Sequence, residues 1–443
     1  MKKYEAYKNS GVEWIGKIPE GWSVVPLKHY LSLKGRIGWN GLKSEEFQEK
    51  SYAYLVTGQD FNSDIVNWEK CYQINKERYD EDPFIQLENG DLLVTKDGTI
   101  GKVAKVVNLD KPACLNSGIF VVKQTKGVFE QNYLYWVLVS NQLKEFVGFN
   151  STGSTIAHLY QNVFENMPLT VPSLTEQQAI ASYLDHKVGQ IDASVSAINT
   201  QIDDLKAYRQ SIISEAVTKG LKPDVKMKDS GIEGGWSIPV HWSSNRLKFL
   251  ADIVRGGSPR PIEEYIADEG YNWIKIGDTI KGYKYIESTK EKIKPSGLNA
   301  TREVHVNDLI LSNSMSFGQP YILKIDGCIH DGWLAFTNYK GLDKEYLYYV
   351  LQAGVCSCQF EHYVAGGVVQ NLNIEKVATT RIPLPPLTEQ QSIATYLDKK
   401  TAQIDSSIDS LEVQRDDLNA LKQSIISEAV TGKIDLRDWK QKN

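Results

Sequence analysis

The sequence predicts two globular α/β domains, related by a pseudo-two-fold axis and separated by a pair of long antiparallel coiled-coil helices. Three observations predict this fold class. Long stretches of the chain recur in the same order, each recurrence ends in a heptad pattern of apolar residues, and short β-rich runs precede that pattern. The predicted domains are residues 1–173 and 220–386, and the predicted helical regions are 174–219 and 387–443, the second with a C-terminal tail.

The internal repeat is strongest in the helical regions. Ser211–Thr218 is identical at every position to Ser424–Thr431, and Leu174–Gln178 is identical to Leu387–Gln391, both at an offset of 213 residues. The offset differs inside the globular halves, which indicates insertions in loops. Similar helices and different globular parts suggest one shared scaffold task and two different recognition tasks.

Each helical region carries a coiled-coil seam. Thr175 with Gln178, and Thr388 with Gln391, fit a capping box that would start each helix, and prolines precede both. Apolar residues then alternate at spacings of four and three, which is typical of coiled-coil pairing, with an ordinary pair of bundle helices as the alternative. Arg415 interrupts the second seam at the position equivalent to Ile202. The residues predicted to pair the helices are Leu184, Val188, Ile191, Val195, Ile198, Ile202, Leu205, Ile404, Ile408, Leu411, Leu418, Leu421 and Ile425.

The order of motifs along the chain predicts how the helices pair. A leading segment, Gly11–Lys28, recurs 220 residues later as Gly231–Lys248, shortly after the first helix ends. If equivalent joints have equivalent geometry, the end of the second helix lies beside the N-terminal segment of the chain. The two helices then run antiparallel, with the globular halves at opposite ends.

The globular halves combine short β-rich runs with one helix each. The helices are expected at residues 131–146 and 344–359. The expected strands are Ala53–Val56, Asp91–Val94, Val103–Val107, Gly118–Val122, Trp273–Ile276, Asp308–Leu311 and Tyr321–Lys324.

Composition excludes several classes of protein. The 443 residues are ordinary for a soluble globular chain, and neither a membrane-spanning run nor a secretory signal is found, so the expected location is cytoplasmic. Five cysteines without zinc-type spacing are expected to be reduced thiols. A net charge of −5 argues against indiscriminate binding to nucleic acid, although a basic face could still form on folding.

Polar, glycine-rich loops at corresponding places in the two halves are the candidate binding elements. They contain the side chains that recognise base edges, and glycine lets the backbone approach a phosphate. For any single residue a solvated turn is the alternative, whereas the set as a whole favours contact with DNA. In the first half the candidates are Lys34, Arg36, Trp39, Asn40, Thr57, Gln59, Lys96, Asp97, Thr99, Ser151, Thr152, Ser154, Thr155 and His158. In the second half they are Arg255, Ser258, Arg260, Lys275, Asp278, Ser312, Asn313, Ser314, Ser316, Gln370, Asn371 and Asn373.

The sequence offers no catalytic motif. It contains no P-loop, no G-x-G-x-x-G after a strand, no Asn-Pro-Pro-aromatic segment and no HExxH. The acidic run Asp80–Asp82 could be imagined as a metal site, but a solvated loop is the expected reading because the second half has no counterpart. We therefore expect no catalytic residue, no metal and no cofactor on this chain.

The repeated helical motif carries a family resemblance. Leu174–Gln178, followed by Tyr183-Leu184-Asp185, and its second copy at Leu387–Gln391 resemble the conserved helical region of specificity subunits of type I restriction-modification systems. The two Ile-Pro…Trp segments, which end at Trp22 and Trp242, resemble the start of that family's target recognition domains. The resemblance covers the whole chain.

The resemblance implies a function that the residues alone do not. Each globular half would be a target recognition domain for one half of a bipartite, asymmetric DNA site, and the helix pair would set the spacer. The helices would also dock two modification subunits, which carry S-adenosylmethionine and methylate adenine. Restriction subunits, which use ATP and magnesium, would join them around a single copy of this non-catalytic chain.

Two other hypotheses remain open on the sequence. The chain could be a bivalent scaffold that holds two other ligands at a fixed separation, which scattered rather than continuous basic charge would favour. It could also be an enzyme with an unrecognised site, which would require converging titratable groups in a pocket.

Overall fold

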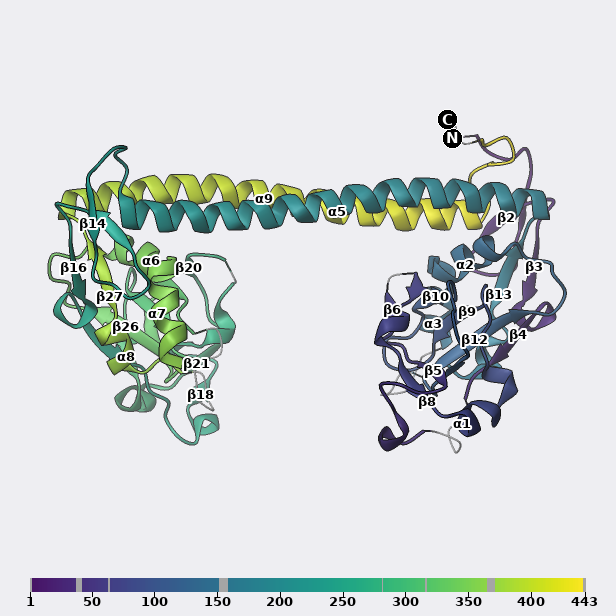
Figure 1. Ribbon diagram of the computed structural model, residues 1–443, viewed down its shortest axis with the longest axis horizontal. Helices are drawn as coiled ribbons and strands as arrows, with labels where there is room; N and C mark the ends of the chain where they lie inside the picture. Colours follow the sequence, from purple (N-terminus) through teal and green to yellow (C-terminus); the bar gives the residue numbers. More distant parts are fainter. Residues whose placement is uncertain are drawn as a thin grey trace. The chain divides into compact units, whose positions relative to one another are not determined.

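The computed structural model describes residues 2–36, 42–62, 64–150, 158–280, 282–314, 317–364 and 371–440. The chain divides into two compact units. The first comprises Met1–Ile198 with Val413–Asn443, and the second comprises Asn199–Glu412. Each unit therefore contains one globular domain together with one end of each long helix, α5 (Leu174–Lys219) and α9 (Leu387–Val430) (Figure 1).

The first unit is built on a mixed six-stranded sheet in the order β4-β12-β9-β10-β7-β6, with a three-stranded sheet β11-β5-β8 and the pairs β1-β2 and β13-β3. The strands are β1 Tyr7–Asn9, β2 Lys17–Pro19, β3 Ser23–Pro26, β4 Leu31–Lys34, β5 Ala53–Val56, β6 Phe61–Asn62, β7 Ile65–Val66, β8 Tyr72–Ile74, β9 Leu92–Thr95, β10 Val103–Lys105, β11 Ala113–Leu115, β12 Ile119–Gln124 and β13 Pro168–Val171.

The second unit repeats this plan with two five-stranded sheets, β17-β26-β23-β24-β20 and β18-β21-β19-β25-β22, and the pairs β14-β15 and β16-β27. The strands are β14 Met227–Asp229, β15 Ser237–Pro239, β16 Ser243–Arg246, β17 Asp252–Arg255, β18 Ile266–Ala267, β19 Tyr271–Ile274, β20 Tyr285–Ile286, β21 Glu291–Ile293, β22 Arg302–Val304, β23 Leu309–Ser312, β24 Pro320–Leu323, β25 Gly327–Ile329, β26 Trp333–Thr337 and β27 Arg381–Leu384.

The shorter helices lie in the globular domains. The α-helices are α1 Lys76–Asp80, α2 Gln131–Val139, α3 Asn141–Asn150, α4 Gln161–Phe164, α6 Lys344–Gln352, α7 Gly354–Val364 and α8 Ile374–Thr379. Short 3-10 helices are Leu27–His29, Ser44–Glu46, Trp68–Lys70, Pro83–Ile85, Leu247–Phe249, Ile262–Glu264, Ile276–Asp278 and Pro295–Ala300.

The strand registers confirm the internal repeat. Tyr7 pairs with Pro19 across β1-β2, and Met227 pairs with Pro239 across β14-β15, so both partners are displaced by the same 220 residues. The central sheets also correspond, because β12 lies between β4 and β9 just as β26 lies between β17 and β23. The duplication seen in the sequence is therefore a duplication of topology.

The sequence predicted a single helix in each globular half. Both predictions are wrong, because each of the two segments folds as two helices. Ser140 takes an extended conformation after α2, and its hydroxyl accepts a hydrogen bond from Gln142 N at 3.2 Å, which starts α3. In the second unit Ala353 separates α6 from α7, and Gly354 N donates to Ser214 Oγ of α5 at 3.2 Å. Side chains that capture backbone groups produce both breaks.

The core of each unit joins the globular domain to the helix pair. In the first unit, α2 lies between the long helices and the sheet (Figure 1), and Tyr133 and Leu134 share one apolar cluster with Leu184 of α5 and Ile426 of α9. In the second unit the equivalent cluster joins α6 to Val217 of α5 and to Leu397 of α9. The helix ends are thus part of each domain's core.

The two long helices run antiparallel within each unit. In the first unit Thr170, just before α5, donates from Oγ1 to the carbonyl of Val430 at the end of α9 at 2.7 Å. Further along, Lys422 Nζ lies 2.6 Å from Asp192 Oδ1. In the second unit Arg209 Nε donates to Asp405 Oδ1 at 2.9 Å. These contacts agree with the antiparallel pairing expected from the motif order.

Most of the predicted seam is covered. Leu184, Val188, Ile191, Ile202, Ile404, Ile408 and Ile425 are buried, and Val195, Ile198, Leu205, Leu411 and Leu418 are half-buried.

Leu421 was assigned to the seam wrongly, because its side chain is 47% exposed. The seam position is Lys422, which is equivalent to Arg209 in α5, and both residues form ion pairs to the opposite helix. A long basic side chain can cover apolar surface with its methylene groups while its charged end reaches the partner helix. Because the seam was predicted from the spacing of apolar residues, this charged position was missed.

The expected capping boxes are also absent, because both helices begin two residues earlier than the motif implied. α5 starts at Leu174, and Ser173 Oγ accepts a hydrogen bond from Glu176 N at 3.4 Å. α9 starts at Leu387, and the carbonyl of Pro386 accepts from Glu389 N at 2.9 Å. The repeated Thr residues therefore lie inside the first turn rather than before it.

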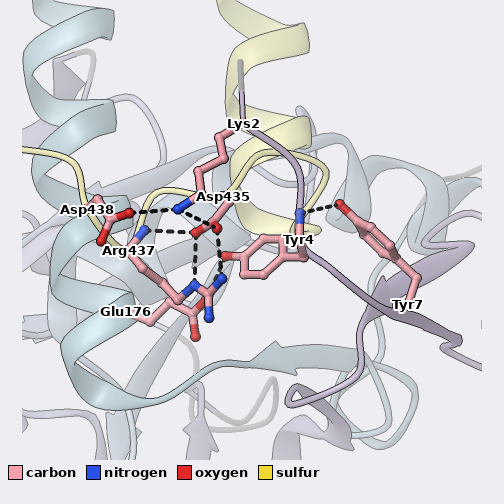
Figure 2. A network of polar contacts seen from close by, with 7 residues as sticks. All are labelled: Lys2, Tyr4, Tyr7, Glu176, Asp435, Arg437 and Asp438. Atoms are coloured by element: carbon pink, nitrogen blue, oxygen red, sulfur yellow. Dashed lines mark hydrogen bonds and ion pairs between the residues drawn. The ribbon is translucent and has the colours of Figure 1, made fainter.

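In the first unit a network of polar contacts joins the N-terminal segment to the residues that follow α9 (Figure 2). Asp435 N donates to the Lys2 carbonyl at 2.9 Å, and the Asp435 carboxylate accepts from Arg437 Nη2 at 2.8 Å. Tyr4 Oη donates to Glu176 Oε1 of α5 at 2.6 Å. The tail after α9 thus holds the N-terminal segment, as the circular motif order predicted. We call this network the closure.

The closure should weaken only in acid. Arg437 holds the pKa of Asp435 below its ordinary value of 3.8, chiefly through its side-chain hydrogen bond. A carboxylate with a depressed folded pKa contributes stability above its unfolded pKa, and that stability is lost as pH falls through the folded pKa. We expect hydrogen exchange of residues 433–439, corrected for intrinsic rates, to rise only below about pH 4. Asp435→Asn should raise it at neutral pH, and unchanged exchange in that variant would contradict the assignment.

Candidate nucleic-acid interface

In the second unit, four of the predicted side chains meet around Asp331, two residues before β26. Arg255 Nε donates to the Asp331 carbonyl at 2.9 Å, and Asn313 Nδ2 donates to the same oxygen at 2.9 Å. Ser258 Oγ donates to Asp331 Oδ1 at 3.0 Å, and Arg260 Nη2 lies 3.6 Å from Oδ2. We call these five residues the Asp331 cluster.

Sheet topology brings the cluster together. Strands β17 and β23 both pair antiparallel with β26, so their ends meet the start of β26 at one edge of the sheet. Gly256 follows β17, and a Cβ at this position would overlap the carbonyl of His330. Only glycine lets the loop pass this close to the backbone before β26.

A cleft of about 640 Å³ lies beside the cluster. His330 lines it, and its Nδ1 accepts from Gly332 N at 2.6 Å, so a neutral ring carries its proton on Nε2. Burial lowers the pKa of His330 below 6.5, which keeps the ring neutral at pH 7. The Lys275 ammonium forms an ion pair with Glu291. The other lining residues are Ser258, Pro259, Arg260, Pro261, Ile262, Glu263 and Trp273.

In the first unit the corresponding loops also come together. Leu159 N donates to the Lys96 carbonyl at 2.9 Å, as Leu372 N does to the Asn313 carbonyl at 2.8 Å in the second unit. Beside this bond, Asp97 contacts His158 Nδ1, and the rings of His158 and Tyr160 are 4.5 Å apart. The side chains differ from those of the Asp331 cluster although the backbone arrangement is the same.

Lys96 and Lys34 contact aromatic rings. Burial lowers the pKa of Lys96, whose Nζ lies 4.9 Å from the centre of the Phe120 ring. Lys34 is exposed, with its Nζ 5.5 Å from the ring of Phe84, which is itself 70% exposed. Only Lys34 of the two lies fully at the surface.

Three predicted residues point into the protein rather than to solvent. Arg36 is 1% exposed, and its Nε donates to the Leu115 carbonyl at 2.9 Å. Ser312 and Asn313 are each 1% exposed. Assigning Arg36 to direct contact with DNA was therefore wrong for this conformation, and Ser312 and Asn313 can act only by supporting neighbours. Residue type and loop position did not reveal that these side chains fold inward.

Several other predicted residues stabilise turns or helix starts. Thr57 donates from N to Asp60 Oδ2 at 2.6 Å, and Asp278 accepts from Lys275 N at 2.8 Å. Asn373 caps α8 by accepting from Lys376 N at 2.9 Å. Gln59 and Thr99 are exposed, and Ser314 and Asn371 are half-exposed. The remaining predicted residues lie outside the described part of the chain; they are Trp39, Asn40, Ser151, Thr152, Ser154, Thr155, Ser316 and Gln370.

The repeated Leu-Thr-Glu-Gln-Gln motif has a structural role that sequence reasoning missed. Gln177 is fully buried, accepts from Glu130 N at 2.8 Å and donates to the carbonyls of Val128 and Pro172 at 3.1 and 3.0 Å. Gln390 makes the three equivalent bonds in the second unit, at 2.7, 3.0 and 2.9 Å. The motif fixes the start of each long helix to its globular domain. The exact repetition of the motif in the sequence was the signal that could have indicated this role.

The glutamates of the motif hold the leading segments. Glu176 accepts from Tyr4 Oη in the first unit. Glu389 accepts from Trp242 Nε1 at 3.1 Å and lies 3.1 Å from His241 Nε2 in the second. The same carboxylate position therefore secures each joint through a different aromatic partner.

No metal site is apparent among the described residues, where no three His, Cys, Asp or Glu side chains converge. Within the acidic run, Asp80 pairs with Lys76, Glu81 pairs with Arg78, and Asp82 caps a 3-10 helix through Phe84 N. The five cysteines are free thiols, four of them buried. No helix in the described ranges is long and apolar enough to cross a membrane.

Two equivalent α/β units with corresponding polar loop clusters define a duplicated, two-domain protein. The comparisons identify the family. The model for the type I restriction modification DNA specificity domain matches residues 19–204 and 239–412, and the chain belongs to this family.

Named relatives agree with this assignment, and a solved structure has a similar fold. The MjaVIII specificity subunit of Methanocaldococcus jannaschii is 26% identical over 440 residues, covering 95% of each chain. The EcoBI specificity subunit of Escherichia coli is 23% identical over 368 residues, covering 80% of this chain and 75% of that one. A chain from a solved type I restriction-modification assembly has a similar fold, with a TM-score of 0.71 at 18% identity over 94% of this chain and 99% of that chain.

Proposed function

We propose that each globular domain recognises one half of a bipartite, asymmetric DNA site. The observation that carries the proposal is the pair of corresponding loop clusters with different side chains. The first unit presents Asp97 and His158, and the second presents Arg255 and Arg260 around Asp331. Because the donors and acceptors differ, the two halves should prefer different bases.

We further propose that the paired helices α5 and α9 set the spacer between the half-sites and dock two modification subunits. A single copy of this non-catalytic chain would serve the complex, in the cytoplasm. S-adenosylmethionine would bind the modification subunits, and ATP and magnesium would bind the restriction subunits. The net charge of −5 makes tight binding by this chain alone unexpected, so the modification subunits should supply part of the affinity.

Co-expression with its modification subunit, followed by genome-wide mapping of methylated adenines, tests this function. We expect one bipartite motif with two unlike half-sites and a fixed unspecified spacer. Methylation that is absent, or that appears equally without this chain, would overturn the proposal. Binding of two other ligands, with no effect of this chain on methylation, would favour the scaffold hypothesis.

Lengthening both helices should lengthen the spacer. We suggest inserting the same seven-residue heptad after Thr200 in α5 and after Val413 in α9, which preserves the seam. Seven residues add about 10.5 Å, which is roughly three base pairs of DNA. The methylated motif should keep both half-sites and gain about that spacer length. As a control, a heptad inserted into α5 alone should break the helix pairing and abolish methylation. An unchanged spacer in the double insertion would show that the helices do not set the spacer length.

A further inference from the structure

We propose that the Asp331 cluster recognises a guanine in the half-site of the second unit, and that Asp331 is the positioning residue that orients its arginines. This inference rests on the proposed function and names the base class that this site would accept.

Arg255 is the more firmly oriented arginine. Its Nε is held by the Asp331 carbonyl at 2.9 Å, while the residue itself is exposed at the end of β17. This bond uses Nε, so the two terminal nitrogens of the guanidinium remain as further donors on an exposed residue. A fork of two N–H donors matches the adjacent N7 and O6 acceptors of guanine in the major groove.

Arg260 is held more loosely. Its side chain is 80% exposed, and its Nη2 lies 3.6 Å from Asp331 Oδ2. An ion pair this exposed contributes little to folding stability. The contact therefore makes more sense as a means of directing the guanidinium than as support for the domain. Ser258, bonded to the other carboxylate oxygen at 3.0 Å, fixes the carboxylate between them.

The cluster and the adjoining cleft present mainly donors. Arg255, Arg260 and the His330 Nε2–H can all donate, whereas the acceptor oxygens of Asp331 are already engaged by Ser258 and Arg260. Lys275 is paired with Glu291, and Glu263 is the acidic side chain that lines the cleft. Adenine and cytosine each present an amino donor in the major groove, which would face other donors here. Thymine presents a single acceptor beside a methyl group, whereas guanine presents two adjacent acceptors, so the guanine edge is the one that matches a fork of two donors.

The first unit lacks this arrangement in its described residues. Arg36, on the corresponding loop, is buried and bonded to Leu115, while Asp97 brings an acceptor to the equivalent cluster. The guanine preference should therefore belong to one half-site only.

The test uses the full chain in complex with its modification subunit and duplexes carrying the mapped motif. Arg255→Ala and Arg260→Ala should each reduce discrimination for guanine at one position of one half-site by roughly 10- to 100-fold. Replacing that guanine with 7-deazaguanine, which lacks N7, should weaken wild-type binding but have little further effect on the variant that lost the contact. Asp97→Ala should change only the other half-site and so identifies which half is which.

Asp331 is tested through its side chain. Asp331→Ala should broaden the base preference at the position that Arg260 contacts, because Arg255 keeps its bond to the main-chain carbonyl. Asp331→Asn, which keeps one acceptor for Ser258, should have a smaller effect. Asp268→Asn, an exposed carboxylate in the same unit outside the cluster, is the matched control and should leave the motif unchanged. Thermal unfolding distinguishes a folding defect from a binding defect. If Asp331→Ala unfolds, Arg260→Ala still tests the inference, because Arg260 is exposed and its substitution should leave the fold intact.

Three outcomes would overturn the inference while leaving the proposed function intact. The motif could contain no G·C pair in the half-site that these variants alter. The arginine variants could lower affinity equally for every sequence, which would indicate phosphate contact. The motif could also be unchanged in every cluster variant. Failure of the wild-type complex to methylate a bipartite motif would instead overturn the proposed function itself.

Discussion

Gln177→Leu should destabilise the first unit by about 2–5 kcal/mol, because each buried backbone group left without a partner costs about 1–3 kcal/mol and such costs add incompletely. Leucine is one methylene shorter than glutamine and can neither accept from Glu130 N nor donate to the carbonyls of Val128 and Pro172. Urea unfolding, with hydrogen exchange of peptides from each unit, would show exchange rising in the first unit.

The repeat supplies the controls for this experiment. Gln178 is the neighbouring glutamine of the same motif and is exposed, so Gln178→Leu should change stability by less than about 0.5 kcal/mol. Gln390→Leu should reproduce the loss in the second unit, because Gln390 makes the same three bonds. Equal effects of Gln177→Leu and Gln178→Leu would show that the buried amide does not hold the joint.

Gly432→Ala should also destabilise the first unit, by about 2–4 kcal/mol. Gly432 follows α9 with a φ of +70°, a conformation that costs other residues about 1–2 kcal/mol. In addition, a Cβ here would overlap the ring of Pro19 and come within 3.2 Å of Trp22. The substitution should therefore push the tail away from the leading segment and increase hydrogen exchange around Lys2 and Asp435.

Gly127→Ala separates the two causes. Gly127 also has a positive φ, of +59°, but no described atom lies within 4 Å of its added Cβ. Its substitution should cost only the backbone strain of about 1–2 kcal/mol and should leave the closure intact. If both variants lose equal stability, close packing of Gly432 on Pro19 does not contribute.

Features that depend on local pattern were predictable. The repeat, the long helices and several strands follow from periodicity and identity within a few consecutive residues. The rule that seam positions are apolar failed at Lys422. There a basic side chain fills the seam position, and Leu421 beside it is exposed. The helix starts were displaced by two residues, because Ser173 and Pro386 precede the first turns in place of the threonines.

The candidate site was predictable only as a set of loops. Sequence order placed Arg255, Ser258, Arg260 and Asn313 on two loops of the second half, but Asp331 was not among the candidates, although it joins them. Arg36 was chosen by the same reasoning and is buried. Which side chain of a loop faces solvent depends on the sheet beneath it.

By itself, the sequence determined that this protein is duplicated, that each copy ends in a long paired helix, and that the copies differ in their loops. These properties can be recognised from residues that are close together in the sequence or repeat at a fixed offset. Only the tertiary structure decided which loop residues meet, because β17, β23 and β26 converge through hydrogen bonds between residues far apart in the chain. It also decided what the repeated motif does, since the partners of Gln177 and Gln390 are backbone groups, which have no sequence signature.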